Sequence, residues 1–351
     1  MQIRNERPPQ DREWPFVSVI MPVLNEERFI AGSLEAVLKQ DYPAFEIIVA
    51  DGMSTDRTRE IIQSVQAQHS NLRLIDNPKR IVPAGLNQAL KCARGEIIVR
   101  ADGHSELPKD YVRRVVELRE QTGADNAGGV LMPVGTNYIS KGIAAAYHSP
   151  IGIGGAQRGH AHAEMVREVD AVHGGCWRRE RLLEVGMFDE EMVRNQDDEL
   201  SFRLRKASGR IIQSTAIRVK YSVRDSFRKL FMQFAQYGYW KVRVIEKHPR
   251  QASFRHFVPA AFLLTLLALA VTAPFLRIAL WAFVALVAGY LSAMTVIGLY
   301  EAARSKLSLW PGITLALLIM QVGYGAGFVV GWLRRVLGPL PTDRIFERVT
   351  R

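Results

Sequence analysis

Cysteine is almost absent from the sequence: Cys92 and Cys176 are the only two among 351 residues. Neither lies in a spacing typical of a metal site, which excludes the common cysteine-based zinc modules. Two isolated cysteines favour reduced thiols in a reducing compartment.

The N-terminus lacks an apolar stretch, since residues 1–14 are polar and charged. A cleavable secretory signal needs an apolar region of about 7–15 residues. The sequence therefore predicts that no signal peptide is removed and that the first domain stays in the cytosol.

Acidic residues are scarcer than basic ones: 35 Asp and Glu against 46 Lys and Arg give a net charge of +11. Nucleic acid, anionic lipid or a phosphorylated substrate could each be the partner of such a charge. Because the basic residues are densest on both sides of an apolar block, they favour the anionic inner leaflet of a membrane over nucleic acid. An ordinary solvated basic face is the alternative. The flanking residues are Arg224, Arg228, Lys229, Lys241, Arg243, Lys247, Arg250 and Arg255 before the block, and Arg334 and Arg335 after it.

Long apolar runs are confined to residues 257–333, where the composition predicts a helical membrane region. We expect a cytosolic domain before this region and a basic tail after it. The predicted bounds are residues 1–250 for the domain, 257–276, 278–299 and 309–333 for the apolar segments, and 334–351 for the tail.

The first apolar segment is the doubtful one. Pro259 and Pro274 bound it, and a helix between them covers roughly 20 Å at 1.5 Å per residue, against a hydrocarbon core of ~30 Å. Three full spans would also leave Arg334 and the basic tail outside, which the positive-inside rule disfavours. An interfacial or re-entrant first segment resolves both conflicts, and the number of full spans stays open.

Before the apolar block, β-rich runs alternate with helical periodicity. The alternation predicts an α/β domain with a mostly parallel sheet covered on both faces. The expected strands are residues 16–21, 45–50, 72–75 and 96–100, and the expected helices are 26–39, a segment carrying Ile61, Ile62 and Val65, and 83–92.

Residues 123–159 are rich in small residues and predict a loop with one short helix over 142–147. The run Gly152-Ile153-Gly154-Gly155 is no dinucleotide fingerprint, because its third glycine is misplaced and no strand–helix pair flanks it. It is either a loop near a substrate or a structural loop.

Polar residues follow three of these strands: Asn25 and Glu26, Asp51, then Asp102 and His104. In open α/β sheets ligands bind outside the carboxyl ends of the strands, so we expect these loops to converge on one crevice. A carboxylate and an imidazole two residues apart can hold one face of a divalent cation and leave the other for phosphate oxygens. An ordinary Asp-Gly turn is the alternative for the Asp102-Gly103-His104 triplet.

Six motifs follow one another along residues 16–240. They are Val17-Ser18-Val19-Ile20-Met21-Pro22-Val23-Leu24-Asn25-Glu26, Asp51-Gly52-Met53-Ser54-Thr55-Asp56, Gly85-Leu86-Asn87, Gly95-Glu96, Asp102-Gly103-His104, and Asn195-Gln196-Asp197-Asp198-Glu199-Leu200 with Arg203 and Arg205. In this order they resemble family 2 glycosyltransferases, and within that family the chain looks like bacterial exopolysaccharide transferases of the succinoglycan type. The resemblance implies a GT-A fold, a nucleotide-sugar donor and a divalent metal, Mn²⁺ or Mg²⁺.

On the donor side, the resemblance implies that Asp51 accepts a hydrogen bond from uracil, that Asp102 lies against the ribose and the metal, and that His104 is a metal ligand. Asp is usual where this chain has His104; imidazole suits Mn²⁺ better than Mg²⁺. A polar turn residue is the alternative for His104. The nucleoside would be lined by Pro22, Leu24 and Glu26. Lys79 and Arg80 either help to bind the donor or are solvated loop charges.

On the acceptor side, the resemblance implies that Asp197 is the base that takes the proton of the attacking hydroxyl. Gln196 replaces the Glu of the family's Glu-Asp pair and is expected to contact the acceptor. Asp198 and Glu199 crowd Asp197 with like charge, which should raise its proton affinity. The alternative is a plain acidic helix start, favoured by the helix dipole.

Two further segments belong to the expected acceptor site. His173-Gly174-Gly175 is either a loop beneath the acceptor sugar, as in the family, or a plain turn. Gln236-Tyr237-Gly238-Tyr239-Trp240 resembles the Gln-x-x-Arg-Trp motif of processive synthases, with Tyr239 at the Arg position. Trp240 could stack on a sugar or anchor at the membrane interface. Apolar residues at helical spacing within 223–248 predict an amphipathic helix on the bilayer surface, or a core-facing helix of the soluble domain.

These expectations add up to a membrane-anchored inverting glycosyltransferase in the bacterial inner membrane, multi-pass, with its catalytic domain in the cytosol. It would move a hexose, with glucose from UDP-glucose expected, to a polyprenyl-diphosphate-linked saccharide in exopolysaccharide biosynthesis, alongside other polysaccharide-assembly proteins. A polyprenyl-phosphate glycosyltransferase, a processive polysaccharide synthase and an inactive scaffold of an export complex are the alternatives. Donor sugar, acceptor sugar, linkage and oligomeric state stay open.

Overall fold

The computed structural model of the chain describes residues 13–149, 151–152, 164–340 and 343–347. It divides into two compact units. Among the described residues, the first unit comprises 13–132 and 164–222, and the second comprises 133–149, 151–152, 223–340 and 343–347. The domain bounds predicted from composition stay a prediction. Most of the glycine run over 152–155, predicted as a loop, lies outside the described residues.

The first unit begins with the predicted alternation of strands and helices. Its first four strands are parallel, in the order β3-β2-β1-β4, which confirms the α/β class. The predicted helix over 26–39 begins only at Ile30, because residues 27–29 form a turn in which Phe29 and Ile30 both donate to the carbonyl of Glu26. The elements are β1 (Val17–Val23), α1 (Ile30–Leu38), β2 (Phe45–Asp51), α2 (Thr58–Gln66), β3 (Leu72–Asp76), α3 (Val82–Cys92), β4 (Ile97–Arg100) and α4 (Tyr111–Thr122).

Beyond β4 the sheet becomes antiparallel, which makes it a mixed sheet. The loop predicted over 123–159 is wrong in its first part, because residues 126–134 form a strand. The small residues there are needed by packing: a Cβ on Gly129 would collide with the carbonyl oxygen of Ile217 on the neighbouring strand. The elements are β5 (Ser105–Glu106), β6 (Asn126–Val134), β7 (Val166–Glu168), β8 (Cys176–Arg178), α6 (Arg179–Glu184), α7 (Gln196–Lys206) and β9 (Ile211–Ser222).

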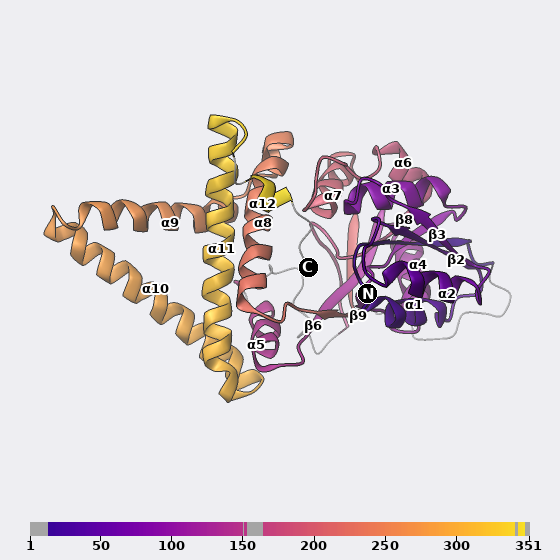
Figure 1. Cartoon of the computed structure of the whole chain (residues 1–351), viewed down its shortest axis with the longest axis horizontal. Coiled ribbons are helices and arrows are strands. Elements are labelled where there is room, and N and C mark those ends of the chain that lie inside the picture. The colour runs from indigo at the N-terminus through magenta and orange to yellow at the C-terminus, as the bar shows by residue number, and fades with distance from the viewer. Residues whose placement is uncertain (1–12, 150, 153–163, 341–342, 348–351) are drawn as a thin grey trace. The chain divides into compact units, whose positions relative to one another are not determined.

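Helices cover both faces of this sheet (Figure 1). Alternate residues of β1 point to opposite sides: Val19 packs in a core formed with α1, α2 and α4, and Ile20 in a core formed with α3, α6 and α7. Cys92 and Cys176 are free thiols, and burial raises the pKa of Cys176 to about 12.

Proline inside a central strand is unusual, because it cannot donate to the ladder. Pro22 is tolerated in β1 because the pairing of β1 with β4 ends at Ile20 and Arg100. The two strands part there, and the loops that follow them are free to turn over the edge of the sheet.

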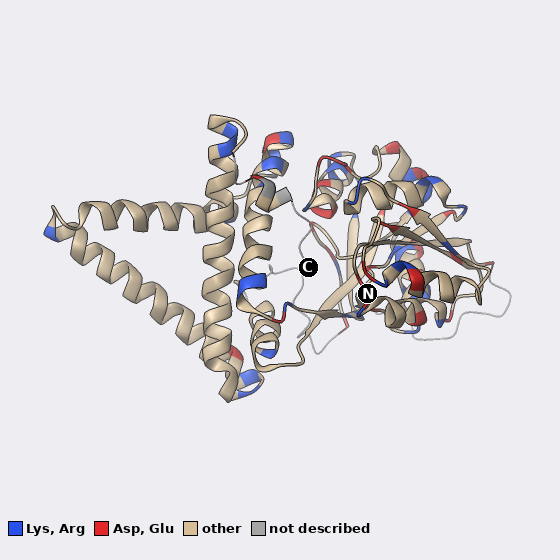
Figure 2. Cartoon of the chain, viewed as in Figure 1, with Lys and Arg blue, Asp and Glu red and all other residues tan. Residues whose placement is uncertain are grey.

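The second unit is helical, and three of its helices are long and apolar enough to cross a membrane. The first of them corrects the shorter estimate from the sequence. It starts at Phe254 and continues through Pro259, so its 19 residues extend about 28 Å at about 1.5 Å each. Figure 2 shows that charged residues gather near the ends of these helices. The elements are α5 (Tyr138–Tyr147), α8 (Phe227–Lys247), η2 (Pro249–Gln251), α9 (Phe254–Thr272), α10 (Arg277–Arg304), η3 (Leu307–Leu309), α11 (Trp310–Leu337) and α12 (Asp343–Glu347).

Helix α8 packs along α11 through a row of glycines on α11. Gly323, Gly327 and Gly331 recur every four residues, and a Cβ on Gly327 would collide with the carbonyl oxygen of Ala235 on α8. Small residues at this spacing let two helix backbones approach closely. Leu230 and Phe234 of α8 are buried within this unit. Tertiary packing therefore accounts for the apolar positions of α8, and its placement on a bilayer surface stays a prediction.

Replacing Gly327 with Ala should destabilise the second unit, because the new methyl group must push two backbones apart. Overpacking of this kind costs typically ~1–3 kcal/mol. Gly289→Ala on α10 is the matched control: nothing lies within 4 Å of its added Cβ, so only the gain in helix propensity of ~0.5–1 kcal/mol remains. Thermal unfolding in detergent should show a lower midpoint for Gly327→Ala alone. Equal midpoints for the two variants would contradict the close packing.

Candidate active site

The polar centre of the first unit is the carboxylate of Asp102, which follows β4 and is 8% exposed. Its Oδ1 accepts a hydrogen bond from Arg100 Nε at 2.9 Å, and its Oδ2 lies 3.2 Å from His173 Nε2. Burial opposes the charged form, but the Arg100 guanidinium, and after it His173 and His104, outweigh burial and hold the pKa of Asp102 well below its usual value. The side chain is therefore an ionised carboxylate at neutral pH.

Arg100 is a site residue that the sequence reasoning missed. It ends an apolar strand and is 7% exposed, and the carboxylates of Asp102 and Asp197 both compensate its charge. Burial lowers its pKa, but the negative charges of Asp102 and Asp197 raise it above the usual value. A single charged residue closing a fully apolar strand was the available signal, since such a residue must have a buried partner.

The His173-Gly174-Gly175 loop brings His173 to Asp102. Both glycines have positive φ, 71° and 120°. A Cβ on Gly174 would lie 3.1 Å from the Tyr111 hydroxyl, and one on Gly175 2.5 Å from the Trp177 ring. The Gly175 carbonyl also accepts from the backbone N–H of Arg100 at 3.1 Å. Packing against Tyr111 and Trp177 therefore explains both glycines, and their contact with an acceptor stays a prediction.

His104 is held from one side by Glu26, whose Oε1 lies 3.2 Å from His104 Nδ1. A carboxylate at Nδ1 favours the tautomer with its proton there, which leaves Nε2 as the acceptor, the usual arrangement of a metal-ligating histidine. Tyr221, at the end of β9, packs edge-on against both imidazoles, with ring centroids 5.9 Å from His104 and 6.0 Å from His173. No sequence pattern indicated Tyr221.

The donor set of Asp102 and His104 fits a divalent cation. It offers an ionised carboxylate and an imidazole oriented by a second carboxylate. Among the described residues, no group of three His, Cys, Asp or Glu side chains is assembled as a complete metal cage. An ion held here would therefore need further ligands from substrate or water. A cavity of about 10 Å³, roughly the room for one water, lies against Arg100, Asp102 and His173.

The loops after β1, β2 and β4 meet at one edge of the sheet, as predicted. The backbone N–H of Asn25 bonds to Ser54 Oγ at 2.9 Å, and Glu26 reaches His104. Asp51, however, is fully buried. Its carboxylate accepts from Ser54 Oγ at 2.6 Å and from Arg59 Nη1 at 3.1 Å. A uracil would have to share these oxygens, so the predicted contact stays a prediction.

Helix α7 carries the predicted base at its start. Asp197 is partly exposed, and its charge acts on Arg100, which relates it to the Asp102 centre. Glu199 is 1% exposed, and both of its oxygens accept from Arg203, at 2.7 and 2.8 Å. Glu199 is therefore engaged in structure, and Asp197 and Asp198 are the carboxylates left with access to solvent.

The remaining predicted site residues are spread more widely. Lys79 pairs with Glu190 at 2.6 Å, and Arg80 is exposed with a φ of 60°. Gln196 is buried at the start of α7. Trp240 belongs to the second unit, where it is 4% exposed and donates from Nε1 to the Phe346 carbonyl at 3.1 Å. Its ring faces are covered in this conformation, and its role toward an acceptor stays a prediction.

The predicted residues that the structure brings together are therefore Glu26, Asp102, His104, His173 and, through Arg100, Asp197. Pro22 and Leu24 lie at the same edge, at and just after the end of β1. The arrangement puts an ionised carboxylate, imidazoles and a buried cation beside a second carboxylate on α7. Such a site can bind a phosphorylated ligand through a metal ion and offer a base to a second substrate.

Comparison with known proteins agrees with this geometry. Residues 18–184 match the model of the family described as glycosyl transferase family 2. The chain is 30% identical to the succinoglycan biosynthesis protein ExoA of Rhizobium meliloti, over 88% of this chain and 93% of that protein. It is 27% identical to a dolichyl N-acetyl-alpha-D-glucosaminyl phosphate 3-beta-D-2,3-diacetamido-2,3-dideoxy-beta-D-glucuronosyltransferase of Methanococcus voltae, over 73% of this chain and 82% of that protein.

The fold is similar to that of a solved mannosyltransferase, PcManGT from Pyrobaculum calidifontis, a structure in complex with GDP-Man and Mn²⁺. The TM-score is 0.56 at 22% identity, with 88% of this chain and 87% of that one covered. The predicted GT-A fold and the resemblance to family 2 are both confirmed.

Proposed function

This chain belongs to glycosyl transferase family 2, and we propose that it is an inverting hexosyltransferase that uses a nucleotide sugar. The observation that carries the proposal is the ionised Asp102, buried at the carboxyl edge of the sheet, with His104 beside it and Asp197 acting on the same arginine. The alternative of an inactive scaffold is less well supported, because a carboxylate and an imidazole suited to a metal ion lie in the same site as a candidate base.

The donor is a UDP-sugar, with UDP-glucose as the first candidate. Pro22, Leu24 and Glu26 line the nucleoside, and Asp51 contacts the base. Asp102 and His104 would hold Mn²⁺ or Mg²⁺, and the bound ion would supply positive charge to the departing diphosphate. The Mn²⁺ in the similar mannosyltransferase supports this assignment. Lys79 and Arg80 follow β3, whose end pairs with Asp51, and they add positive charge to the donor site when Lys79 leaves Glu190.

The acceptor hydroxyl attacks the anomeric carbon, and Asp197 takes its proton. The bond between that carbon and the diphosphate oxygen breaks, and the nucleoside diphosphate leaves with the electron pair. Attack from the side opposite the leaving group inverts the anomeric centre. Arg100 interacts electrostatically with both carboxylates. It keeps Asp102 ionised on the donor side, while Asp197 accepts the proton on the acceptor side.

The acceptor is a saccharide on a polyprenyl diphosphate. The names of two relatives support a glycan assembly role: one acts in succinoglycan biosynthesis, and the other is named for a dolichyl-linked sugar phosphate. His173, Gly174, Gly175 and Gln196 contact this acceptor, and Trp240 joins them if its ring becomes exposed. Other polysaccharide-assembly proteins are the expected partners.

Processive synthesis is disfavoured by the state of Tyr239, which stands where a processive synthase has Arg. The side chain is fully buried in the second unit, stacks on Phe346 with centroids 4.6 Å apart, and donates to Asp343 Oδ1 at 2.9 Å. Tyr239 is therefore engaged in packing, and transfer of a single sugar per acceptor agrees better with the structure than processive synthesis.

Residues 1–250 form the cytosolic catalytic domain in this proposal, 257–333 cross the bacterial inner membrane, and 334–351 form the basic tail. Arg334 and Arg335 end α11, and the positive-inside rule places them in the cytosol. A reporter fused after Arg351 should therefore report the cytosolic side. A tail found outside would instead mean that α9, α10 and α11 all span, since α9 is long enough to do so.

The function is tested by incubating membranes that contain the protein with a panel of labelled nucleotide sugars. We expect one UDP-hexose to label the lipid fraction, and EDTA to abolish the labelling until Mn²⁺ or Mg²⁺ is restored.

The His104→Ala variant should need much more metal for the same rate, because it removes one of two protein ligands. Full transfer in EDTA would contradict the metal assignment, and no labelling from any donor would contradict the activity.

The base is tested by Asp197→Asn, which keeps the shape and removes the proton acceptor. Turnover should fall by ~10²–10⁴-fold, the usual contribution of a general base, while binding of UDP is retained. Asp198→Asn is the matched control, because it removes the same charge from the next position of the same helix turn. Equal losses in the two variants would point to the charge of the helix start and not to a base at Asp197.

A further inference from the structure

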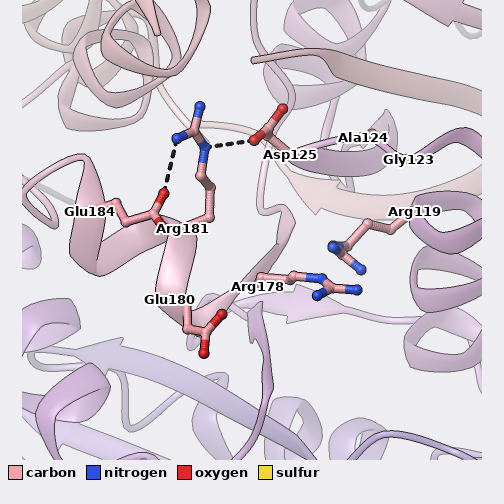
Figure 3. A pocket seen from close by; sticks show the side chains of 8 residues that line it. All are labelled: Arg119, Gly123, Ala124, Asp125, Arg178, Glu180, Arg181 and Glu184. Carbon is pink, nitrogen blue, oxygen red and sulfur yellow. Dashed lines mark hydrogen bonds and ion pairs between the residues drawn. The ribbon is translucent and has the colours of Figure 1, made fainter. Parts of the chain in front are cut away.

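The first unit contains a second, larger cavity outside the proposed catalytic apparatus. Its volume is about 150 Å³, and it lies where the end of α4 and the turn after it meet β8 and α6 (Figure 3). None of its lining residues takes part in the mechanism above. The lining residues are Arg119, Gly123, Ala124, Asp125, Arg178, Glu180, Arg181 and Glu184.

Two of the three acidic side chains in the lining are already neutralised by one arginine. Arg181 donates from Nε to Asp125 at 2.6 Å and from Nη1 to Glu184 at 3.0 Å. Its Nη2 donates to the carbonyl of Ala207 at 3.0 Å, so its fork is fully used. Glu180 is exposed. The acidic groups of the cavity therefore leave the other two arginines uncompensated.

Arg119 is the unusual residue of this cavity. It is 7% exposed, and its Nε is buried without a hydrogen-bond partner. Within the described part of the chain, its guanidinium forms no hydrogen bond and no ion pair. Figure 3 shows its guanidinium facing that of Arg178, which also lacks such a partner among the described residues. Burial, together with the like charge of Arg178, lowers the pKa of Arg119 below its usual value.

The surrounding structure does not explain a buried, unpaired guanidinium. Arg119 lies in the last turn of α4, where the helix dipole favours a cation, but that effect is smaller than the cost of burying an unpaired charge. Glu96 and Glu120 contribute favourable charge from a distance without bonding to it. A group that accepts hydrogen bonds from both guanidiniums would remove the repulsion and satisfy Nε.

We propose that this cavity binds a small oxyanion of the phosphate type between Arg119 and Arg178. Two forked guanidiniums present parallel N–H donors that match tetrahedral oxyanions. The cavity volume corresponds to about five waters at roughly 30 Å³ each, whereas pockets for drug-sized ligands occupy about 300–1,000 Å³. The site therefore fits inorganic phosphate with a few waters and is too small for a nucleotide sugar. It is separate from the proposed transferase chemistry and does not depend on it.

The test compares the full chain in detergent with sodium phosphate and with sodium chloride at equal pH and ionic strength. Phosphate should raise the thermal midpoint with saturation, because a ligand that binds only the folded state stabilises it by mass action. Equilibrium dialysis with labelled phosphate should give one ion per chain. No phosphate-specific shift in the wild-type protein would overturn the proposal.

Variants locate the effect. Arg119→Met should lose the phosphate shift and, without phosphate, unfold at or above the wild-type midpoint, since a buried unpaired charge is gone. Arg178→Met replaces an exposed side chain, should fold normally and should also lose most of the shift, so it decides the matter if Arg119→Met does not fold. Arg113→Met, on the same helix but paired with Asp41 and Glu117, should keep the full shift. The same shift in Arg178→Met as in the wild type would overturn the proposal.

Discussion

The buried ion pair between Arg100 and Asp102 is the constraint on which the site depends. Both residues are more than nine-tenths buried, and a carboxylate in that environment stays ionised only if its partners hold it. Removing one partner of such a pair costs ~3–5 kcal/mol, because the other charge is left uncompensated. The end of β4 and the glycine loop that carries His173 are therefore held together at Asp102, and the charge of Asp197 at the start of α7 acts on the same arginine.

In the proposed mechanism, two carboxylates of one site take different roles. Asp102 is surrounded by Arg100, His173 and His104 and is held in its charged form. Asp197 has access to solvent, and it influences the same arginine without that enclosure. A binding carboxylate and a proton acceptor need different environments. The first unit supplies them on two elements, the loop after β4 and the start of α7.

The second unit is held together by helix packing. The contact between α8 and α11 depends on glycines that let the two backbones approach, in addition to buried apolar side chains such as Leu230 and Phe234. Lipid is as apolar as leucine, so helices in or near a membrane gain little by burying large side chains, and close backbone packing takes over. Tyr239 and Trp240 are also buried in this unit, against α12. Each ring can be buried because its polar atom has a hydrogen-bond partner there.

The sequence by itself determined the local features of this protein. Alternating periodicity gave the parallel strands, apolar length gave the three long helices, and the order of Asp51, Asp102 and Asp197 gave the family. Only the tertiary structure decided what depends on contacts between distant segments. It made a strand of 126–134, placed His173 on Asp102, added Arg100 and Tyr221 to the site, and buried the apolar face of α8 on α11. These features depend largely on contacts between residues far apart in the chain, such as His173 with Asp102 and Gly129 with Ile217, and no local pattern reports such contacts.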